Sequence, residues 1–515
     1  MEHGSETYFV LGEGLLGESL GGRPRTLARA DETATVPFRF SRMGPKGGGK
    51  QIPEGIRKKL ADAMAVSGGG TSGIPAGFTY LGQFADHDLT FDKTNVMLGE
   101  HVAPTALLQA RSPSLDLDSL YGAGPTDPGS EQFYEADGIH LRMGKTVAAD
   151  GIASKDGFDL PRGAGSNVAA KRKAIIPDPR NDENLAVAQT HLAFIRFHNR
   201  VVDAQPGSVP AGAKFEKART RVTLHYQWML RTDFLPRICD GPVITDVFTN
   251  GRKAFEVGAT PTDVPTMPIE FSVAAYRLGH SMVRASYNWN KIFDDGFGSL
   301  DLLFAFSATS GDLGGFQRLI SSWIADFRRL YDFPAAGHAT LGVPAAKFNQ
   351  AMRIDTRIVN PLQFLPGFSG DEANLAFRNL TRANMVRLAT GQQMVTFLKN
   401  KGISITKLTK AQIRDGAGGA ELSDLTQAQR ERLLTDTPLW FYILREAELN
   451  GGKLTGVGAR IVAETFHRAM EGSEHSIVRD PTWRPSLGPN SSTFRMADLL
   501  FFAFEGKKNL LAPLG

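Results

Sequence analysis

The chain has 515 residues, of which 42% are hydrophobic and 22% are charged, a composition typical of a globular protein. The formal net charge of +4 comes from Lys and Arg residues scattered among acids, which argues against a nucleic-acid-binding surface. Cys239 is the only cysteine, so an intramolecular disulfide, a cysteine zinc site and a CxxCH haem attachment are excluded, and no apolar run approaches the roughly 18 residues of a membrane span.

Residues 1–75 are rich in Gly, Pro, Arg and Thr, and we expect them to form an irregular arm. No signal peptide is readable at its start, so we expect a cytoplasmic protein or one secreted by a leaderless route. Residues 12–17 match the dinucleotide-binding pattern GxGxxG, but the next segment is broken by glycine and proline. Residues 44–50, GPKGGGK, are similar to a phosphate-binding loop. Because Gln51 lacks the hydroxyl that would hold magnesium, we interpret them as a mobile basic loop.

Residues 76–515 are expected to form one large, mainly α-helical domain with long loops and little β-structure. Up to about residue 165 the pattern indicates short helices within loops. After about residue 180, apolar residues recur with the 3.6-residue period of amphipathic helices. The segments with this period are 183–204, 217–238, 268–289, 373–398 and 438–450. No internal repeat and no linker divides this region.

The segment from Gln83 to Asp88 places a histidine between two carboxylates. In a helix, Gln83 lies one turn before His87 and shares its face. Asp86 and Asp88 then point about 100° to either side of His87. One short helix would therefore present a base to one compartment and a carboxylate to another, which suits a buried cofactor with a cation behind it.

Three further segments add candidate residues, each with a simpler alternative. Arg180 and Glu183 share a face at the start of a long helix, as an ordinary surface pair also would. Gly279 adjoins His280 within a predicted helix, where a glycine costs about 1 kcal/mol and suggests a flat object close to the backbone. A core histidine is the alternative there. In residues 112–118, oxygen-bearing side chains occupy every second position, which suits either a polar turn or, together with Asp88, a calcium cage of six or seven oxygens.

Taken together, these segments resemble the animal-type haem peroxidases, the peroxidase–cyclooxygenase superfamily. The motifs GQFADHDLTF, SPSLDLDSLYG, PRNDEN followed by THLAFIRFHNRV, YRLGHS and FRNLTRAN occur in the order and rough spacing of that family. The match runs from about residue 76 to about residue 500. It implies a helical haem-binding fold and a peroxidase that reduces hydrogen peroxide through a ferryl intermediate.

On the distal side of the haem, the resemblance implies three catalytic residues. His87 is similar to the histidine that takes a proton from peroxide and returns it to the departing oxygen. It must start neutral, so we expect burial to lower its pKa. Arg180 is similar to the arginine that stabilises charge as the O–O bond breaks. Gln83 is similar to the glutamine that shapes the water and halide site.

On the proximal side, the resemblance implies that His280 binds the iron. Asn379 is similar to the residue that accepts a hydrogen bond from the other ring nitrogen of that histidine, and a neutral amide there tunes the iron. Arg277 is similar to a residue that pairs with a haem propionate. Cyclooxygenases and fatty-acid dioxygenases have a radical-forming tyrosine at the position of Arg277, so we expect a peroxidase, with a fatty-acid dioxygenase as the alternative.

The resemblance also bears on covalent haem attachment, substrates and calcium. Asp86 and Glu183 match the carboxylates that form ester bonds to haem methyl groups. Asn184 occupies the place of the methionine that makes a third link in myeloperoxidase, so we expect bromide, iodide, thiocyanate or phenols as electron donors rather than chloride. One calcium ion is implied, and its expected ligands are Asp88, Ser112, Ser114, Asp116 and Asp118.

Overall fold

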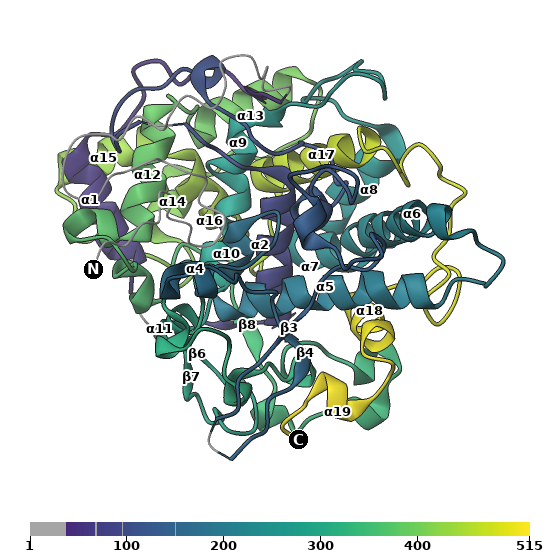
Figure 1. Ribbon diagram of the computed structural model, residues 1–515. Helices are drawn as coiled ribbons and strands as arrows, with labels where there is room; N and C mark the ends of the chain where they lie inside the picture. Colours follow the sequence, from purple (N-terminus) through teal and green to yellow (C-terminus); the bar gives the residue numbers. More distant parts are fainter. Residues whose placement is uncertain (1–37, 67–68, 95, 150) are drawn as a thin grey trace.

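The structure is a computed structural model that describes residues 38–66, 69–94, 96–149 and 151–515. These residues form a mainly helical body, with helices packed around a central helix and long loops over the surface (Figure 1). The expected mainly α class is therefore confirmed. The GxGxxG motif lies outside the described residues.

Helices of eight or more residues form the body. They are α1 (Glu54–Met64), α2 (Gly77–Leu89), α5 (Leu185–Asp203), α6 (Ala211–Met229), α8 (Gly241–Asn250), α12 (Leu375–Met385), α13 (Gly391–Asn400), α15 (Gln427–Thr435), α16 (Leu439–Leu449), α17 (Gly456–Glu471) and α18 (Met496–Ala503). Shorter helices lie between them. They are α3 (Asp118–Tyr121), α4 (Val168–Arg172), α7 (Leu235–Ile238), α9 (Ile269–Ser272), α10 (Gly279–Met282), α11 (Leu300–Ala305), α14 (Lys410–Asp415) and α19 (Lys508–Leu511). No helix in the described part of the chain is long and apolar enough to cross a membrane.

The β-structure consists of short paired strands. Strand β1 (Phe40–Ser41) pairs in parallel with β5 (Met267–Pro268). The antiparallel pairs are β2 (Thr71–Pro75) with β8 (Gln350–Met352), β3 (Gly144–Lys145) with β4 (Asp156–Asp159), and β6 (Ser286–Tyr287) with β7 (Gly298–Ser299). Such short strands carry too little apolar surface to form a core, so the helices supply it.

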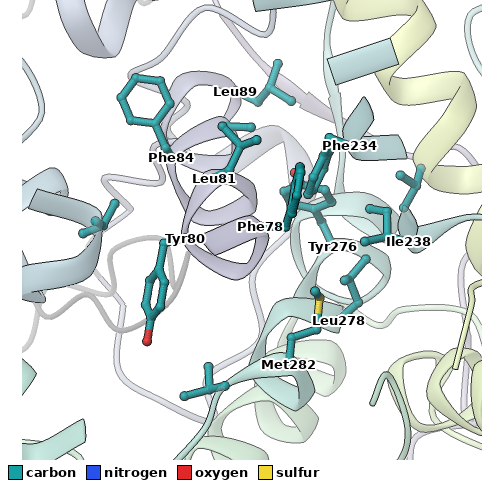
Figure 2. Packing of buried hydrophobic residues seen from close by; sticks show 14 of the residues in the cluster. Phe78, Tyr80, Leu81, Phe84, Leu89, Phe234, Ile238, Tyr276, Leu278 and Met282 are labelled. Carbon is teal, nitrogen blue, oxygen red and sulfur yellow. The ribbon is translucent and has the colours of Figure 1, made fainter. Parts of the chain in front are cut away.

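Helix α2 lies at the centre of the hydrophobic core. Its aromatic and aliphatic side chains point away from the helix on several sides, with Phe78 toward Phe234 and Tyr276, and Phe84 on the opposite side (Figure 2). The helix packs against α5, α3 and α10. A helix that is apolar around most of its circumference is fully buried, and the polar residues that α2 carries are buried with it.

The start of α2 is fixed by contacts with distant parts of the chain. Strand β2 leads directly into it and is paired with β8, about 280 residues later. At Gly77 a Cβ atom would lie 2.3 Å from the ring of Tyr331, whose hydroxyl donates a hydrogen bond to the Gly77 carbonyl. Only glycine fits this close approach, so the residue type at 77 sets where the helix begins.

Two sequence predictions of local structure need correction. Residues 38–75 are not an irregular arm throughout, because Ile56, Leu60, Ala61 and Met64 of α1 form a buried face that packs against α12. The helix expected over residues 268–289 is broken instead into α9, a 3₁₀ turn over Ala275–Leu278 and α10. The break follows from the backbone at Ala274, whose φ of −135° and ψ of −69° lie outside the helical region.

Candidate active site

Helix α2 presents its polar residues to three different surroundings. Gln83, Asp86, His87 and Asp88 are all buried within it. As the spacing predicts, Gln83 and His87 share one face. Both approach Glu183, the residue that precedes Asn184 at the start of α5. Asp86 and Asp88 point elsewhere, so one helix serves three separate groups of partners.

The imidazole of His87 is neutral and oriented by an amide. Its Nδ1 lies 2.9 Å from Asn181 Oδ1, and because a carbonyl oxygen only accepts, Nδ1 carries the proton. Its Nε2 is therefore a proton acceptor. This atom has no hydrogen-bond partner among the described residues and lies 3.6 Å from Glu183 Oε1. Burial, and then the charge of Arg180, lower the pKa of His87 to about 3, as the requirement for a neutral base predicts.

Arg180 lies beside His87 in a network of fixed charges. One terminal nitrogen donates to the His87 carbonyl oxygen at 3.0 Å. The guanidinium also donates hydrogen bonds of 3.0 and 2.7 Å to the Asp178 carboxylate. Arg111 donates to the same carboxylate at 2.7 Å. Burial alone would raise the pKa of Asp178, but the two arginines hold it below its usual value. The guanidinium carbon of Arg180 lies 4.3 Å from the centre of the Phe91 ring. Arg180 is thus held rigidly by one carboxylate and one ring.

A chain of amides joins α2 to the start of α5. Gln83 Nε2 donates a short hydrogen bond to Glu183 Oε1. Gln83 Oε1 accepts one from Asn184 Nδ2 at 3.1 Å. The other end of the Asn184 amide caps α5, because Asn184 Oδ1 accepts from the Val187 backbone N–H at 2.9 Å. The structure thus brings together four candidate site residues of the sequence analysis: Gln83, His87, Arg180 and Glu183.

His280 lies on α10, which packs against α2. Its Nδ1 is 2.7 Å from Asn379 Nδ2 on α12, so the expected pair is in contact. The amide presents its nitrogen rather than the expected oxygen, and Asn379 Oδ1 has no hydrogen-bond partner in the described part of the chain. Trp440 of α16 stands edge-on to His280 with ring centres 6.3 Å apart, and its indole N–H donates to the Arg277 carbonyl at 3.3 Å.

Two cavities lie beside α2, and only the second of them is lined by residues of both α2 and α10. One is lined by Arg277, Arg382, Asp92 and apolar residues. The other is mainly apolar and is lined by Gln83, Asp86, Tyr276 and Gly279, among others. An added Cβ at Gly279 would meet no atom within 4 Å, so the backbone beside His280 faces open space. The sequence suggested a flat object close to the backbone here, and this stays a prediction.

Asp86 lies at the border of the apolar cavity. Burial raises its pKa to about 6, and the positive charges of Arg277 and Arg180 limit the rise. Arg277 itself donates through Nε to the Ser272 carbonyl at 2.7 Å. A carboxyl group in this environment exchanges readily between its neutral and charged forms near neutral pH.

The acidic residues expected to hold calcium lie near one another but do not form a cage. Burial and the charge of Asp118 raise the pKa of Asp88 to about 8, and burial and Asp116 raise that of Asp118 to about 6. Asp88 accepts hydrogen bonds from the backbone N–H groups of Leu117 and Ser119 at 3.2 and 3.3 Å. Residues 38–66, 69–94, 96–149 and 151–515 contain no cluster of three His, Cys, Asp or Glu side chains placed to hold a metal.

The reason is the orientation of the loop residues. Asp116 turns away and accepts from Ser473 Oγ and, at 3.0 Å, from the Glu474 backbone N–H. Ser114 Oγ donates to the Gly472 carbonyl at 3.2 Å, and Ser112 Oγ accepts from the Ser114 N–H at 3.3 Å. The alternating pattern therefore brings these side chains to one region without turning their oxygens to one point.

Sequence reasoning missed Asn181 and Asp178, which orient His87 and Arg180. Both precede the periodic part of α5, and Asp178 caps the 3₁₀ turn Pro179–Asp182 through its bond to the Arg180 N–H. An Asp before a proline at such a turn is a recognisable capping signal, but nothing local indicates the second partner of each side chain. The bridging role of Asn184 was also missed.

Residues 74–325 match the family model of the animal haem peroxidases. The peroxidase-like protein of Margaritifera margaritifera is 33% identical over 111 residues, which are 21% of this chain and 14% of that protein. Thyroid peroxidase of Rattus norvegicus is 34% identical over 109 residues, which are 21% of this chain and 11% of that protein. The matched segments therefore span less than a sixth of these relatives.

Solved structures show the same fold along nearly the whole chain. Peroxidase A from Dictyostelium discoideum aligns with a TM-score of 0.58 at 15% identity, over 92% of this chain and 94% of that one. A fatty acid alpha-dioxygenase from Arabidopsis thaliana aligns with a TM-score of 0.57 at 13% identity, over 92% and 78%. The resemblance first seen in the motifs is confirmed over residues 74–325, which match the animal haem peroxidase family model.

Proposed function

We propose that this protein is a haem peroxidase, which reduces hydrogen peroxide to water and oxidises a small electron donor. The observation that carries the proposal is the state of His87. It is a buried neutral imidazole with its proton on Nδ1, and its Nε2 has no hydrogen-bond partner within the described residues. A base in this state, held beside the cationic fork of Arg180, suits the transfer of a proton from peroxide.

The residues between α2 and α10 fit a haem group. Open space adjoins Gly279 in the cavity that Gln83 and Asp86 also line, and a second cavity is lined by Arg277, Arg382 and Asp92. His280 would bind the iron and Arg277 would pair with a propionate. Asp86 and Glu183 would form ester bonds to haem methyl groups. Haem bound there supplies the two electrons that break the O–O bond of peroxide.

The distal side chains move and stabilise charge. His87 Nε2 takes a proton from hydrogen peroxide and returns it to the departing oxygen, a transfer worth roughly 10²–10⁴-fold in rate. Asn181 keeps Nε2 unprotonated at rest, because its oxygen holds the proton on Nδ1. Arg180 stabilises the negative charge that develops on oxygen, an effect of roughly 10²–10³-fold. Asp178 holds the guanidinium in place.

The amide group of Asn379 would have to rotate for His280 to bind iron. A histidine that binds iron through Nε2 carries its proton on Nδ1, so Asn379 must face it with Oδ1. A half-turn of the amide achieves this, because oxygen and nitrogen exchange places and Oδ1 gains the partner that it lacks. A neutral amide acceptor leaves the histidine less anionic than a carboxylate would, which raises the potential of the iron.

One calcium ion would complete the site behind α2. Asp88 is buried, Asp116 and Asp118 are half-buried, and the pKa of each carboxyl group is raised. The negative charges of Asp118 and Asp116 contribute to the raised pKa of Asp88. A divalent cation would remove this repulsion and would draw Asp116 away from Ser473. Ser112 and Ser114 would add oxygen ligands. Strong chelation should then lower haem occupancy and activity together, because Asp88 adjoins His87.

The electron donors we infer are bromide, iodide, thiocyanate or phenols. A fatty-acid dioxygenase is the second candidate, and two observations favour it. The fold is similar to that of a fatty acid alpha-dioxygenase, and the buried hydroxyl of Tyr276 has no hydrogen-bond partner in the described part of the chain and borders the cavity that contains Asp86. The position three residues before His280 is nevertheless Arg277, which supports the peroxidase.

An absorption spectrum of the purified protein after haem supplementation tests the proposal. We expect a Soret band, peroxide-dependent oxidation of a phenol, and no oxygen uptake with a polyunsaturated fatty acid. A protein without a Soret band would refute haem binding. Oxygen uptake that depends on Tyr276, removed by Tyr276→Phe, would instead establish the dioxygenase.

A further inference from the structure

Asn184 connects the end of one helix to the distal side chains of another. It is buried at the position before α5, where its Oδ1 accepts from the Val187 N–H at 2.9 Å. Its Nδ2 donates to Gln83 Oε1 on α2 at 3.1 Å. The amide therefore uses one end to cap a helix and the other to hold a residue of the candidate active site.

The direction of every hydrogen bond in this chain of contacts is determined. A backbone N–H can only donate, so Asn184 must turn its oxygen to Val187 and its nitrogen to Gln83. Gln83 must then present its oxygen to Asn184, and its nitrogen donates to Glu183 Oε1. That oxygen lies 3.6 Å from His87 Nε2. Amide orientations are often ambiguous, but a backbone donor at one end removes the ambiguity here.

We propose that Asn184 is a positioning residue that fixes the amide of Gln83 with its N–H₂ group toward Glu183 and the distal imidazole. The inference rests on the proposed peroxidase function and deepens it. An N–H₂ group on this side of the site meets a small anion such as iodide with a donor, whereas the reversed amide would meet it with a carbonyl oxygen. Asn184 thereby makes the site able to accept anionic electron donors.

Asn184→Asp tests this reversal without removing the cap. Aspartate caps a helix about as well as asparagine, so α5 keeps its bond to the Val187 N–H. The second carboxylate oxygen cannot donate to Gln83 Oε1, and two acceptors would face each other. Gln83 is then no longer held with its N–H₂ group toward Glu183, because in either orientation its carbonyl oxygen faces a carboxylate oxygen, of residue 184 or of Glu183.

The experiment uses four haem-loaded proteins: wild type, Asn184→Asp, Gln83→Met and the double variant. The first measurement is the iodide dissociation constant of the ferric protein, from an absorbance titration. We expect Asn184→Asp to weaken iodide binding roughly tenfold, since about one hydrogen bond to the anion is lost. In the Gln83→Met background the same change should alter binding by less than about twofold, because the two residues act as one unit. The Michaelis constant for a neutral phenol should stay unchanged in Asn184→Asp.

The second measurement is the melting temperature of the four haem-free proteins. Asn184→Asp should lower it more where Gln83 is present than in the Gln83→Met background. The proposal is overturned if Asn184→Asp binds iodide as wild type does, or if it weakens binding equally in both backgrounds. A wild-type protein that takes up no haem would refute the proposed function instead. In that case, melting temperatures that fall equally in both backgrounds would still refute the role of Asn184.

Discussion

The orientation of His87 by Asn181 yields a quantitative prediction. Asn181→Asp keeps an acceptor for the Nδ1 proton but adds a negative charge within 3 Å of the ring, judged from the 2.9 Å contact. An adjacent opposite charge raises a histidine pKa by about 1–3 units, so the value of about 3 in the wild type should rise to about 4–6. The base works only when neutral. The rate of reaction with peroxide should therefore begin to fall at a higher pH in the variant.

Asn181→Leu is the matched control, because it removes the acceptor without adding charge. Loss of this hydrogen bond, worth about 0.5–1.5 kcal/mol, reduces the preference for the reactive tautomer by a factor of roughly 2–12. The rate of reaction with peroxide should fall at neutral pH in Asn181→Leu. The pH at which this rate begins to fall on acidification should not rise. Stopped-flow absorbance at the Soret band between pH 3 and pH 8 measures both effects. The reasoning would be refuted if the rate of Asn181→Asp fell at the same acidic pH as that of the wild type and if Asn181→Leu reacted at the wild-type rate.

Three other predictions concern the iron ligand, the acidic cluster and the arginine clamp. His280→Ala should abolish the Soret band, whereas Asn379→Asp should retain it and lower the midpoint potential in spectroelectrochemistry. Because the folded pKa of Asp88, about 8, lies above its unfolded value, the calcium-free protein should lose stability as the pH rises from about 4 to about 8. Calcium should abolish this loss in thermal unfolding, and a slope unaffected by calcium would contradict the site. Asp178→Asn leaves Arg180 and its neighbouring arginine without their carboxylate, so denaturant titration should show destabilisation by about 3–5 kcal/mol. A loss below 1 kcal/mol would mean that water replaces the carboxylate.

Residue spacing was sufficient to predict the arrangement around α2. Side-chain direction in a helix follows from position alone, so Gln83 and His87 had to share a face while Asp86 and Asp88 diverged. The helical class followed in the same way from the 3.6-residue period of segments such as α5. The contact between His280 and Asn379 came from the resemblance, because nothing in the local sequence joins residues 99 positions apart.

What the sequence could not indicate depends on partners far along the chain. Asp116 turns from the other acids because Ser473 and Glu474 offer it donors, and no pattern in residues 112–118 reveals them. The sequence also could not indicate the break at Ala274. The short helical turns on either side of it show the same 3.6-residue apolar period as a continuous helix. Pairing choices of this kind are decided by packing rather than by local propensity.

The three directions in which α2 presents Asp86, His87 and Asp88 limit how this segment can change in length. Adding or deleting one residue within the helix rotates everything beyond it by about 100°. Such a change would put an aspartate where the imidazole belongs and the imidazole where an aspartate belongs. Because Gly77 is locked against Tyr331, the helix cannot rotate back to compensate. Libraries built to alter the chemistry of this protein should therefore exchange residues in α2 and leave its length untouched.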